Sequence, residues 1–411
     1  MLKRDKNTGK IVINSGEVRM ATDVPGISFD FNCGIHLTLP AENYEIRFKN
    51  LDYCTEHAVT VTGPAEVRLG PAYYCRYGLE VLSSGKPVWT HEYNAAGRNV
   101  HIEMANLFSL KEVLTAISAA EQFRVKHGCR LYVTVLEKYA DILRPAYPEI
   151  EIFPITLDKE NDFLPGAWHS LPQEIYATYY MGMFTDDYYT PEPVKMCGLK
   201  NMFAKILGVD STDWITNKLV ASTGLAGKVP SSPYACVGLY AGKDWEQWHS
   251  SRGWEYVLRY LRSIGYRILC LDTPDERVKI ATELLEQGAE DFTGKTLQEN
   301  IDLLSGADFC IGTANDISWL AWGTRRSVVL ISGAPRRNMQ FCTPYMGNYH
   351  GACDYCRYSD HIYEGKEGCP EYSGTDKEFE CTKLVTPQNI CRLIRRVIRD
   401  NDLMPDKDFE E

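Results

Sequence analysis

The feature that most constrains the fold is a regular alternation of apolar runs and amphipathic stretches that begins near residue 98. "NVHIEMA" reads as a buried strand, and "SLKEVLTAISAAEQFRVKHG" reads as a helix that Ser109 caps and Gly128 ends. "RLYVTVL" and "EIEIFPI" then predict two further strands. Strands that alternate with helices in this way predict an α/β fold with a parallel sheet.

A second α/β half follows the polar segment "TGLAGKVPSSP", whose composition is typical of a linker. It contains four strand-like runs separated by helical stretches, and these runs are "YACVGLY", "YRILCLD", "DFCIG" and "SVVLISG". Two Rossmann-like halves describe a glycosyltransferase architecture in which a nucleotide-sugar binds beyond the carboxyl ends of the second half's strands. The sequence therefore predicts an α/β protein with two Rossmann-like domains.

The first ninety or so residues have a different, two-residue rhythm. Apolar and polar residues alternate around Ile27–Phe31, Ile35–Leu39, Tyr44–Phe48 and Val59–Val61, and "LEVLSSGKPVWTHEY" predicts two strands joined by a Ser-Gly turn. Short strands at this spacing favour a small antiparallel sandwich or barrel that serves recognition or assembly. The predicted domains are residues 1–97, 98–228 and 229–411, the last with a loop at 342–385 and a closing C-terminal helix.

That loop holds four cysteines among charged, glycine and aromatic residues. Cys353 and Cys356 form a Cys-x-x-Cys knuckle, and Cys369 and Cys381 follow it. Four thiolates can complete a tetrahedral site, and a loop with few aliphatic residues needs such a staple. Zinc is the default metal, a rubredoxin-like iron is the chemical alternative, and unligated thiols remain the simpler reading. A closed site leaves no position for substrate, so its role is structural and a thiol-based redox sensor is disfavoured.

Composition excludes several classes of protein. The formal charge is −11, and the basic run Arg392–Arg399 fits the polar face of a helix, so nucleic acid is not an expected partner. We find neither a signal peptide nor a membrane span, which predicts a cytoplasmic protein. Reduced thiols are then expected for the 14 cysteines, with Cys236, Cys270 and Cys310 buried in strands.

The order of several motifs resembles the bacterial autotransporter protein O-heptosyltransferases, relatives of the ADP-heptose:lipopolysaccharide heptosyltransferases. The similarity runs from about residue 27 to 400, and it includes "FDFNCGIHLTLP", "VWTHEYNAAGRNVHIE", "ISWLAWGTRRSVVLISG" and "CDYC…GCPEY…FECTKLVTPQ". The resemblance implies a GT-B-type transferase with an N-terminal β domain, which moves heptose from ADP-heptose to serines of an adhesin passenger. It also implies iron at the four cysteines, which makes iron the preferred metal, and assembly into a large homo-oligomer.

The sequence departs from the family at the position of the general base. The family's Ser-Leu-Gly-Asp turn corresponds here to Ser109, Leu110, Lys111 and Glu112. Glu112 can still act as a base, but the extra methylene moves the carboxylate by about 1.5 Å, and a shift of this order can cost about a hundredfold in rate. The simpler reading of Glu112 is a first-turn helix residue that favours the dipole.

Two further departures lie at the positions that the resemblance assigns to the nucleotide-sugar. Glu246 stands where the family has a lysine, so that Lys243 or Arg252 would have to contact the phosphates, although Lys243 also reads as an ordinary surface lysine. Asn315 and Asp316 replace a Ser-Gly pair at a helix start that receives phosphate, and Asp316 reads most simply as the helix cap. Ser318 and Trp319 complete this set, with Trp319 read first as a core residue.

These departures leave two hypotheses open. The protein is either a glycosyltransferase with an altered donor site, which uses ADP-heptose or another nucleotide-sugar, or a catalytically impaired paralogue. In the second case it pairs with an active heptosyltransferase or holds the acceptor protein, as part of a homo- or hetero-oligomer.

Overall fold

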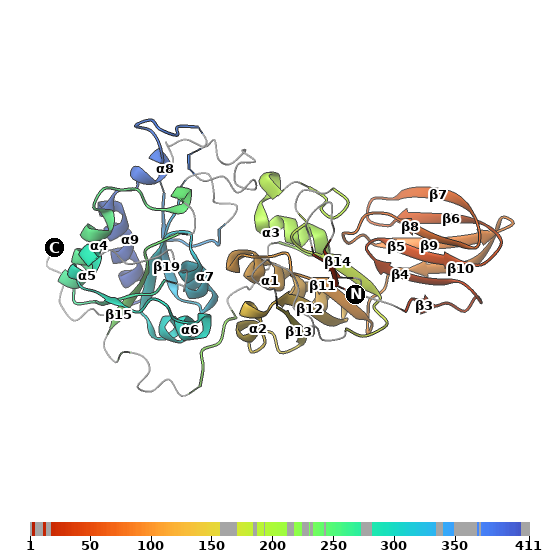
Figure 1. Ribbon diagram of the computed structural model, residues 1–411, viewed down its shortest axis with the longest axis horizontal. Helices are drawn as coiled ribbons and strands as arrows, with labels where there is room; N and C mark the ends of the chain where they lie inside the picture. The colour runs from red at the N-terminus through yellow and green to blue at the C-terminus, as the bar shows by residue number, and fades with distance from the viewer. Residues whose placement is uncertain are drawn as a thin grey trace. The chain divides into compact units, whose positions relative to one another are not determined.

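The computed structural model divides the chain into two compact units, Met1–Ile215 and Thr216–Glu411 (Figure 1). The structure describes residues 2–4, 11–13, 18–156, 171–183, 187–192, 194–211, 218–223, 230, 233–241, 244–272, 282–333, 340–348, 368–369 and 371–403. Each unit contains its own sheet and helices, which confirms the predicted α/β class.

The first unit is built on a mixed sheet of eight strands. Its order is β13 (Ile150–Ile155), β12 (Arg130–Leu136), β11 (Asn99–Glu103), β14 (Ala177–Tyr180), β4 (Ser28–Asn32), β5 (Ile35–Leu39) and β8 (Ala65–Leu69), with β3 (Met20–Ala21) also paired to β4. The strands run parallel from β13 to β4 and antiparallel from β4 to β8. Four N-terminal strands, β3, β4, β5 and β8, therefore share one sheet with the predicted first Rossmann-like strands.

A second, four-stranded antiparallel sheet packs on the β4 end of this sheet. Its order is β10 (Lys86–Glu92), β9 (Tyr77–Ser83), β6 (Asn43–Asn50) and β7 (Thr55–Thr62). The predicted Ser-Gly turn joins β9 to β10, because Ser84 and Gly85 both adopt positive φ angles. The layer between the two sheets is aromatic, with the Phe29 and Trp89 rings 4.8 Å apart. A short pair of strands, β1 (Leu2–Arg4) and β2 (Ile11–Ile13), also belongs to the unit.

The helices in the described part of the first unit are α1 (Leu110–His127), α2 (Glu137–Leu143) and α3 (Val194–Leu207). The predicted ends of α1 are confirmed, since Ser109 is its N-cap and Gly128 ends it in the left-handed conformation at φ 59°. Ten α1 residues are buried, among them Val113, Ile117 and Phe123, so the helix packs over most of its length. Strand β14 and helix α3 were not expected from the sequence.

The second unit has a parallel sheet of six strands. The order is β17 (Ala289–Asp291), β16 (Arg267–Cys270), β15 (Tyr234–Gly238), β18 (Phe309–Gly312), β19 (Ser327–Ile331) and β20 (Met346–Gly347). Helices α4 (Gly253–Ser263) and α9 (Pro387–Asp400) lie on one side of the sheet, and α6 (Leu297–Gly306) and α7 (Asp316–Gly323) lie on the other (Figure 1). Elsewhere in the described residues of this unit lie η1 (Asp244–Glu246), α5 (Thr282–Glu286) and α8 (Glu380–Lys383). Cys236, Cys270 and Cys310 are buried in this sheet, as predicted.

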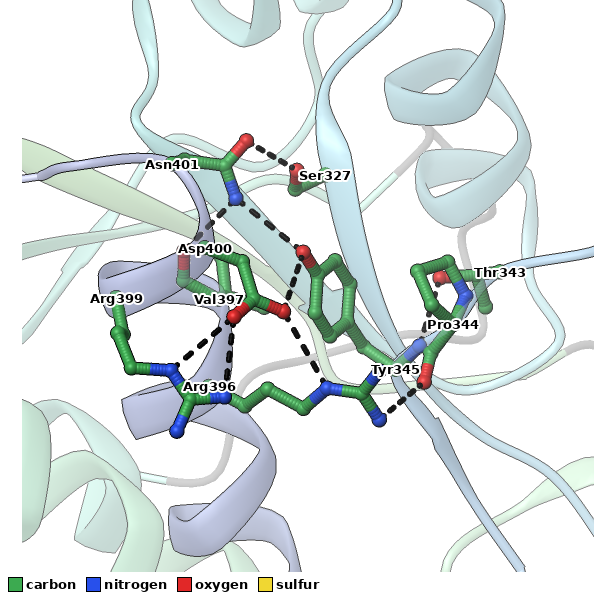
Figure 2. A network of polar contacts seen from close by, with 9 residues as sticks. All are labelled: Ser327, Thr343, Pro344, Tyr345, Arg396, Val397, Arg399, Asp400 and Asn401. Atoms are coloured by element: carbon green, nitrogen blue, oxygen red, sulfur yellow. Dashed lines mark hydrogen bonds and ion pairs between the residues drawn. The ribbon is translucent and has the colours of Figure 1, made fainter.

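Hydrogen bonds and ion pairs at the C-terminal end of helix α9 connect it to the segment before β20 and to β19 (Figure 2). Asp400 accepts hydrogen bonds from Arg396, Arg399 and the Tyr345 hydroxyl. Asn401 donates to the Val397 carbonyl oxygen at 2.8 Å. The pKa of Asp400 is lowered by the hydrogen bond from Arg399. The basic run of the sequence thus lies on the polar face of α9, where Arg396 and Arg399 pair within the chain.

No helix in the part of the chain that the structure describes is long and apolar enough to cross a bilayer.

Candidate nucleotide-sugar site

Four of the sequence-predicted donor residues, Asn315, Asp316, Ser318 and Trp319, lie at the start of α7, which follows β18 and lies beside the carboxyl end of β15. Gly238 and Gly312 end the strands and are partners in the parallel register. A Cβ atom on Gly238 would lie 2.6 Å from Asn315 Nδ2, and one on Gly312 would lie 2.3 Å from Ser318 Oγ. Only glycine fits these two positions, because the side chains of α7 lie directly against the strand ends.

Asn315 occupies the N-terminus of α7 with its own side chain. Its Oδ1 accepts the Ser318 backbone N–H at 3.0 Å, and its Nδ2 donates to the Tyr240 carbonyl oxygen at 2.7 Å. The Ser318 hydroxyl donates to the Thr313 carbonyl oxygen at 2.7 Å. A backbone donor that an anion could otherwise use is therefore satisfied within the protein.

The structure corrects one detail of the sequence reading, because the cap of α7 is Asn315 and Asp316 is the first helical residue. Asparagine and aspartate are about equally good caps, so local sequence preference alone could not choose between them. The bond to the Tyr240 carbonyl oxygen, in the segment after β15, selects Asn315, since an aspartate side chain has no N–H to donate. Asp316 is half-buried and adds a negative charge to the first turn.

Trp319 is a core residue. Its side chain is 4% exposed and its indole N–H donates to Gln340 Oε1 at 3.2 Å. Its ring packs edge-on against Trp322 at 5.5 Å and against Phe341 at 5.0 Å. Of the two readings of Trp319, the structure favours packing over contact with a nucleotide.

The loop after β15 carries the residues expected to contact phosphate. Glu246 ends η1. Arg252 forms a two-pronged ion pair with Glu255, at 2.6 Å for each nitrogen, and its side chain is 73% exposed. Lys243 lies outside the described residues. Arg252 is thus committed to a surface pair on α4.

A buried acid that sequence reasoning missed, Asp272, follows β16 at the same edge of the sheet. Its side chain accepts the backbone N–H groups of Leu239 and Tyr240 and lies 3.6 Å from Cys270 Sγ. Burial raises the pKa of Asp272 to about 7, against the lowering effect of these hydrogen bonds. An aspartate directly after a buried parallel strand was the available signal, because side chains there point toward the ligand edge of such sheets. Together with Asn315, Asp272 holds the main chain of Tyr240 from two sides.

The predicted general base lies in the first unit. Glu112 is the third residue of α1, is half-buried, and accepts the Ser109 backbone N–H at 3.2 Å. The fully buried Glu103 at the end of β11 accepts the Ala105 backbone N–H at 2.5 Å and an Asn106 amide N–H at 3.2 Å. Both carboxylates therefore take part in local backbone structure.

Two of the four cysteines predicted to hold a metal, Cys369 and Cys381, are described. The Tyr372 backbone N–H donates to Cys369 Sγ at 3.4 Å, as in metal knuckles where amides stabilise the sulfur charge. A Cβ atom on Gly333 would lie 3.2 Å from Cys381 Sγ, so this sulfur lies against the end of β19. Cys353 and Cys356 lie outside the described residues, and within the described ranges no three histidine, cysteine or acidic side chains converge as metal ligands.

Comparison with known proteins first defines the class. TibC, an iron-containing dodecameric glycosyltransferase from enterotoxigenic E. coli, superposes with a TM-score of 0.79 and 29% identity, covering 95% of this chain and 100% of its own. A second TibC structure, in complex with ADP-D-β-D-heptose, matches equally well. The fold is therefore that of a glycosyltransferase, although no family model matches the sequence.

Curated relatives then define the family. The autotransporter heptosyltransferase Aah of Escherichia coli is 31% identical over 391 residues, covering 90% of this chain and 93% of Aah. BimC of Burkholderia thailandensis, an inactive autotransporter heptosyltransferase, is 30% identical over 384 residues, covering 90% of this chain and 86% of BimC. The chain belongs to the autotransporter heptosyltransferase family, which confirms the resemblance seen in its motifs.

Proposed function

We propose that this protein is a non-catalytic member of its family, whose donor site no longer retains the pyrophosphate of a nucleotide-sugar. The observation that carries the proposal is the Asn315 side chain, which satisfies a backbone donor at the start of α7. An incoming phosphate would have to displace that amide and break its 2.7 Å bond to the Tyr240 carbonyl oxygen.

Acidic side chains add an electrostatic argument. Glu246 lies in the segment that follows β15, and Asp316 begins helix α7 beside the same sheet. At an effective dielectric constant of about 20, one carboxylate about 6 Å from one phosphate charge costs nearly 3 kcal/mol, or about a hundredfold in affinity. The described Arg252, which could have offset this charge, is paired with Glu255.

The contacts of Glu112, the predicted general base, also favour a non-catalytic protein. The Glu112 carboxylate caps its own helix through the Ser109 N–H, so using it as a base would cost α1 a capping interaction. The alternative is an active transferase with Glu112 as base and with Lys243, Ser318 and Trp319 at the donor. That alternative requires a nucleotide to bind.

Titration calorimetry with ADP, UDP and ADP-heptose tests the proposal, with TibC as the positive control. We expect no saturable heat at millimolar ligand for this protein. A variant that restores the family residues, Glu246→Lys with Asn315→Ser and Asp316→Gly, should bind ADP. The matched control Glu286→Lys makes the same charge change on the exposed end of α5 and should not bind. Micromolar binding by the unaltered protein would refute the proposal.

The metal belongs to the same proposal. Iron held by Cys353, Cys356, Cys369 and Cys381 would staple the loop between β20 and α9, with zinc as the alternative. The Tyr372 N–H to Cys369 Sγ bond and the iron of TibC support it. Elemental analysis with a visible spectrum tests the metal, since colourless protein that contains zinc would exclude iron. Bound as four thiolates, the metal supplies structure and no catalytic step.

The partner follows from the family. We propose that the chain holds an autotransporter passenger in the cytoplasm, as a partner of an active paralogue or as a scaffold, within an oligomer of GT-B-type protomers. The support is the family assignment, the dodecameric TibC and the inactive BimC. Mass photometry of the protein alone, with an active heptosyltransferase and with a passenger tests each arm. Failure to bind either protein would refute this part.

A further inference from the structure

Helices α4 and α9 pack side by side on the sheet of the second unit, and each turns one face to solvent. Their apolar residues enter the core, among them Val257, Ile394 and Val397. The opposite faces carry aromatic and arginine side chains at the three- and four-residue spacing of a helical stripe. We call this surface the arginine face, and it consists of Tyr256, Arg259, Tyr260, Arg392, Arg395 and Arg399. All of these residues except the half-buried Tyr260 are exposed.

Arg395 joins the two stripes into one surface. Its Nε donates to the Tyr260 hydroxyl at 3.2 Å, and its guanidinium carbon lies 5.6 Å from the centre of the Tyr260 ring. A side chain of α9 thus lies on a ring of α4, so a single ligand could contact both helices.

The charge of these two helices differs in sign from that of the chain. They carry six arginines, no lysine and two acids, in a chain whose formal charge is −11. On α9, Arg392 repels Arg396 and Arg395 repels Arg399, because like charges four residues apart destabilise a helix. The polar face of α9 therefore holds more positive charge than helix stability favours.

Two carboxylates of the chain itself show how these arginines bind acids. Asp400 accepts hydrogen bonds from Arg396 at 3.3 Å and from Arg399 at 3.1 Å (Figure 2). On α4, Glu255 forms an ion pair with Arg259 at 2.8 Å. Each acid is thus held by arginines of its own helix, as guanidinium groups hold carboxylates at interfaces.

The middle of the arginine face has no such acid. Among the described residues, Arg392 has no hydrogen-bond or ion-pair partner, and Arg395 pairs with no carboxylate. Tyr256 lies on the same face and is 46% exposed. Arginine and tyrosine are among the residues that contribute most to binding at protein interfaces. A ligand that carries carboxylates would therefore find two available guanidinium groups and an aromatic ring.

The size of the face indicates a short segment as the ligand. Helix α9 has 14 residues and is about 21 Å long, and two packed helices are about 20 Å wide. The face therefore covers about 400 Å², about half of what each partner buries in a standard stable complex. A second folded copy of the chain would need more surface, whereas an extended peptide of about seven residues spans α9.

We propose that the arginine face is a docking site for a short acidic segment of a partner protein. Glutamate or aspartate side chains of that segment pair with Arg392 and Arg395, and an apolar residue packs on Tyr256. No nucleotide and no metal takes part in this contact. The inference can therefore be tested separately from the proposed loss of donor binding.

Fluorescence anisotropy with the full-length protein tests the site. The probe is a fluorescein-labelled peptide of about ten residues, rich in glutamate and with a central phenylalanine, and the control peptide carries glutamine in place of glutamate. We expect the acidic probe to bind with a Kd of about 10–100 µM at about 0.05 M salt. Binding should weaken at least about tenfold at about 0.5 M salt, because salt screens exposed charges. The glutamine peptide should not bind.

Variants separate the site from the overall charge. Arg392→Gln with Arg395→Gln should weaken binding of the probe at least about tenfold, and circular dichroism should show an unchanged fold, since glutamine is a good helix former. Arg392→Lys with Arg395→Lys should keep the salt dependence but bind about threefold more weakly, because lysine cannot form a two-pronged pair with a carboxylate. Arg130→Gln with Arg144→Gln is the matched control, which makes the same charge change at exposed positions of the first unit and should bind as the unaltered protein does.

Several results would overturn the proposal. Failure of the acidic probe to bind, or an equal loss in the glutamine variants of both units, would show that the face is not a site. Tighter binding of a short DNA duplex, of anionic lipid vesicles or of a peptide with the acidic sequence of residues 404–411 would assign the face to that ligand instead. A change of oligomeric state in the Arg392→Gln, Arg395→Gln variant, measured by mass photometry, would make the face an interface between copies of the chain.

Discussion

Replacing Asp272 by asparagine should remove a specific pH dependence from the stability of the second unit. The Asp272 carboxyl group is buried beside Leu239 and Tyr240, and its pKa is raised from 3.8 to about 7. The unfolded chain releases the proton near pH 4, whereas the folded chain keeps it until near neutrality. Stability therefore falls as the pH rises through this window, because the folded state binds the extra proton.

The size of the effect follows from the two pKa values. At pH 8 the whole gap of about 3 units applies, which corresponds to about 4 kcal/mol. At pH 5 only about 1.2 units of that gap apply, or about 1.6 kcal/mol. From pH 5 to pH 8, ionisation of Asp272 should therefore lower the free energy of unfolding of the second unit by about 2.5 kcal/mol more. Asparagine cannot ionise, and its amide oxygen can still accept one of the two backbone N–H groups.

Urea unfolding at pH 5 and pH 8 measures this difference, with exchange of the β15 and β16 amides reporting on the second unit. The advantage of Asp272→Asn over the unaltered protein should grow by about 2.5 kcal/mol from pH 5 to pH 8. Asp291→Asn is the matched control, since hydrogen bonds from Thr293 lower the pKa of Asp291 below its usual 3.8, so its contribution is already complete at pH 5 and its substitution should give nearly the same change at both pH values. Equal advantages for Asp272→Asn at both pH values would show that Asp272 does not titrate as its burial implies.

Other parts of the molecule give further predictions. Burial lowers the pKa of His101 to about 3, so the free energy of unfolding of the first unit should fall as the pH drops below 6.5, where the unfolded chain takes up a proton that the folded chain does not. Between pH 7.5 and pH 5 urea unfolding should show about 2 kcal/mol less of this fall for His101→Gln than for the unaltered protein. An equal fall in both proteins would contradict this. Residues 1–97 expressed alone should be unfolded by circular dichroism, because β4 then lacks its partner β14, whereas residues 1–215 should fold. Trp319→Ala should destabilise the second unit by about 3–5 kcal/mol without creating nucleotide binding, and a smaller loss would argue against its core role.

Local structure was largely predictable because it depends on neighbouring residues. Ser109 and Gly128 mark the ends of α1, and Ser84 with Gly85 marks the β9–β10 turn. The parallel pairing of β4 with β14 could not be predicted, because the two strands are far apart in the sequence and only three-dimensional packing brings them together. That pairing joins the N-terminal strands to the α/β sheet.

The sequence identified which residues of the candidate site are unusual, but it could not predict which partners their side chains contact. The sequence marked Asn315 and Asp316 as unusual, but only the bond to Tyr240 in the segment after β15 shows why Asn315 is the cap. The sequence indicated that Arg252 could contact a phosphate, whereas in the structure its guanidinium forms an ion pair with Glu255, three residues later. Asp272 was missed because a single aspartate after a strand carries no motif, although its burial makes it the most perturbed acid among the described residues of this edge.

The changes at the donor edge stabilise the fold by the same contacts that oppose an anion. A serine at the position of Asn315 could also cap α7, but it has no amide N–H to donate to the Tyr240 carbonyl oxygen. Asn315 both satisfies the Ser318 N–H and ties α7 to Tyr240. Asn315→Ser alone should therefore destabilise the second unit without creating an ADP site, because Glu246 and Asp316 would still repel the pyrophosphate. Only restoration of the charge and the small residues together should recover binding, as expected when positions that share one ligand are not additive.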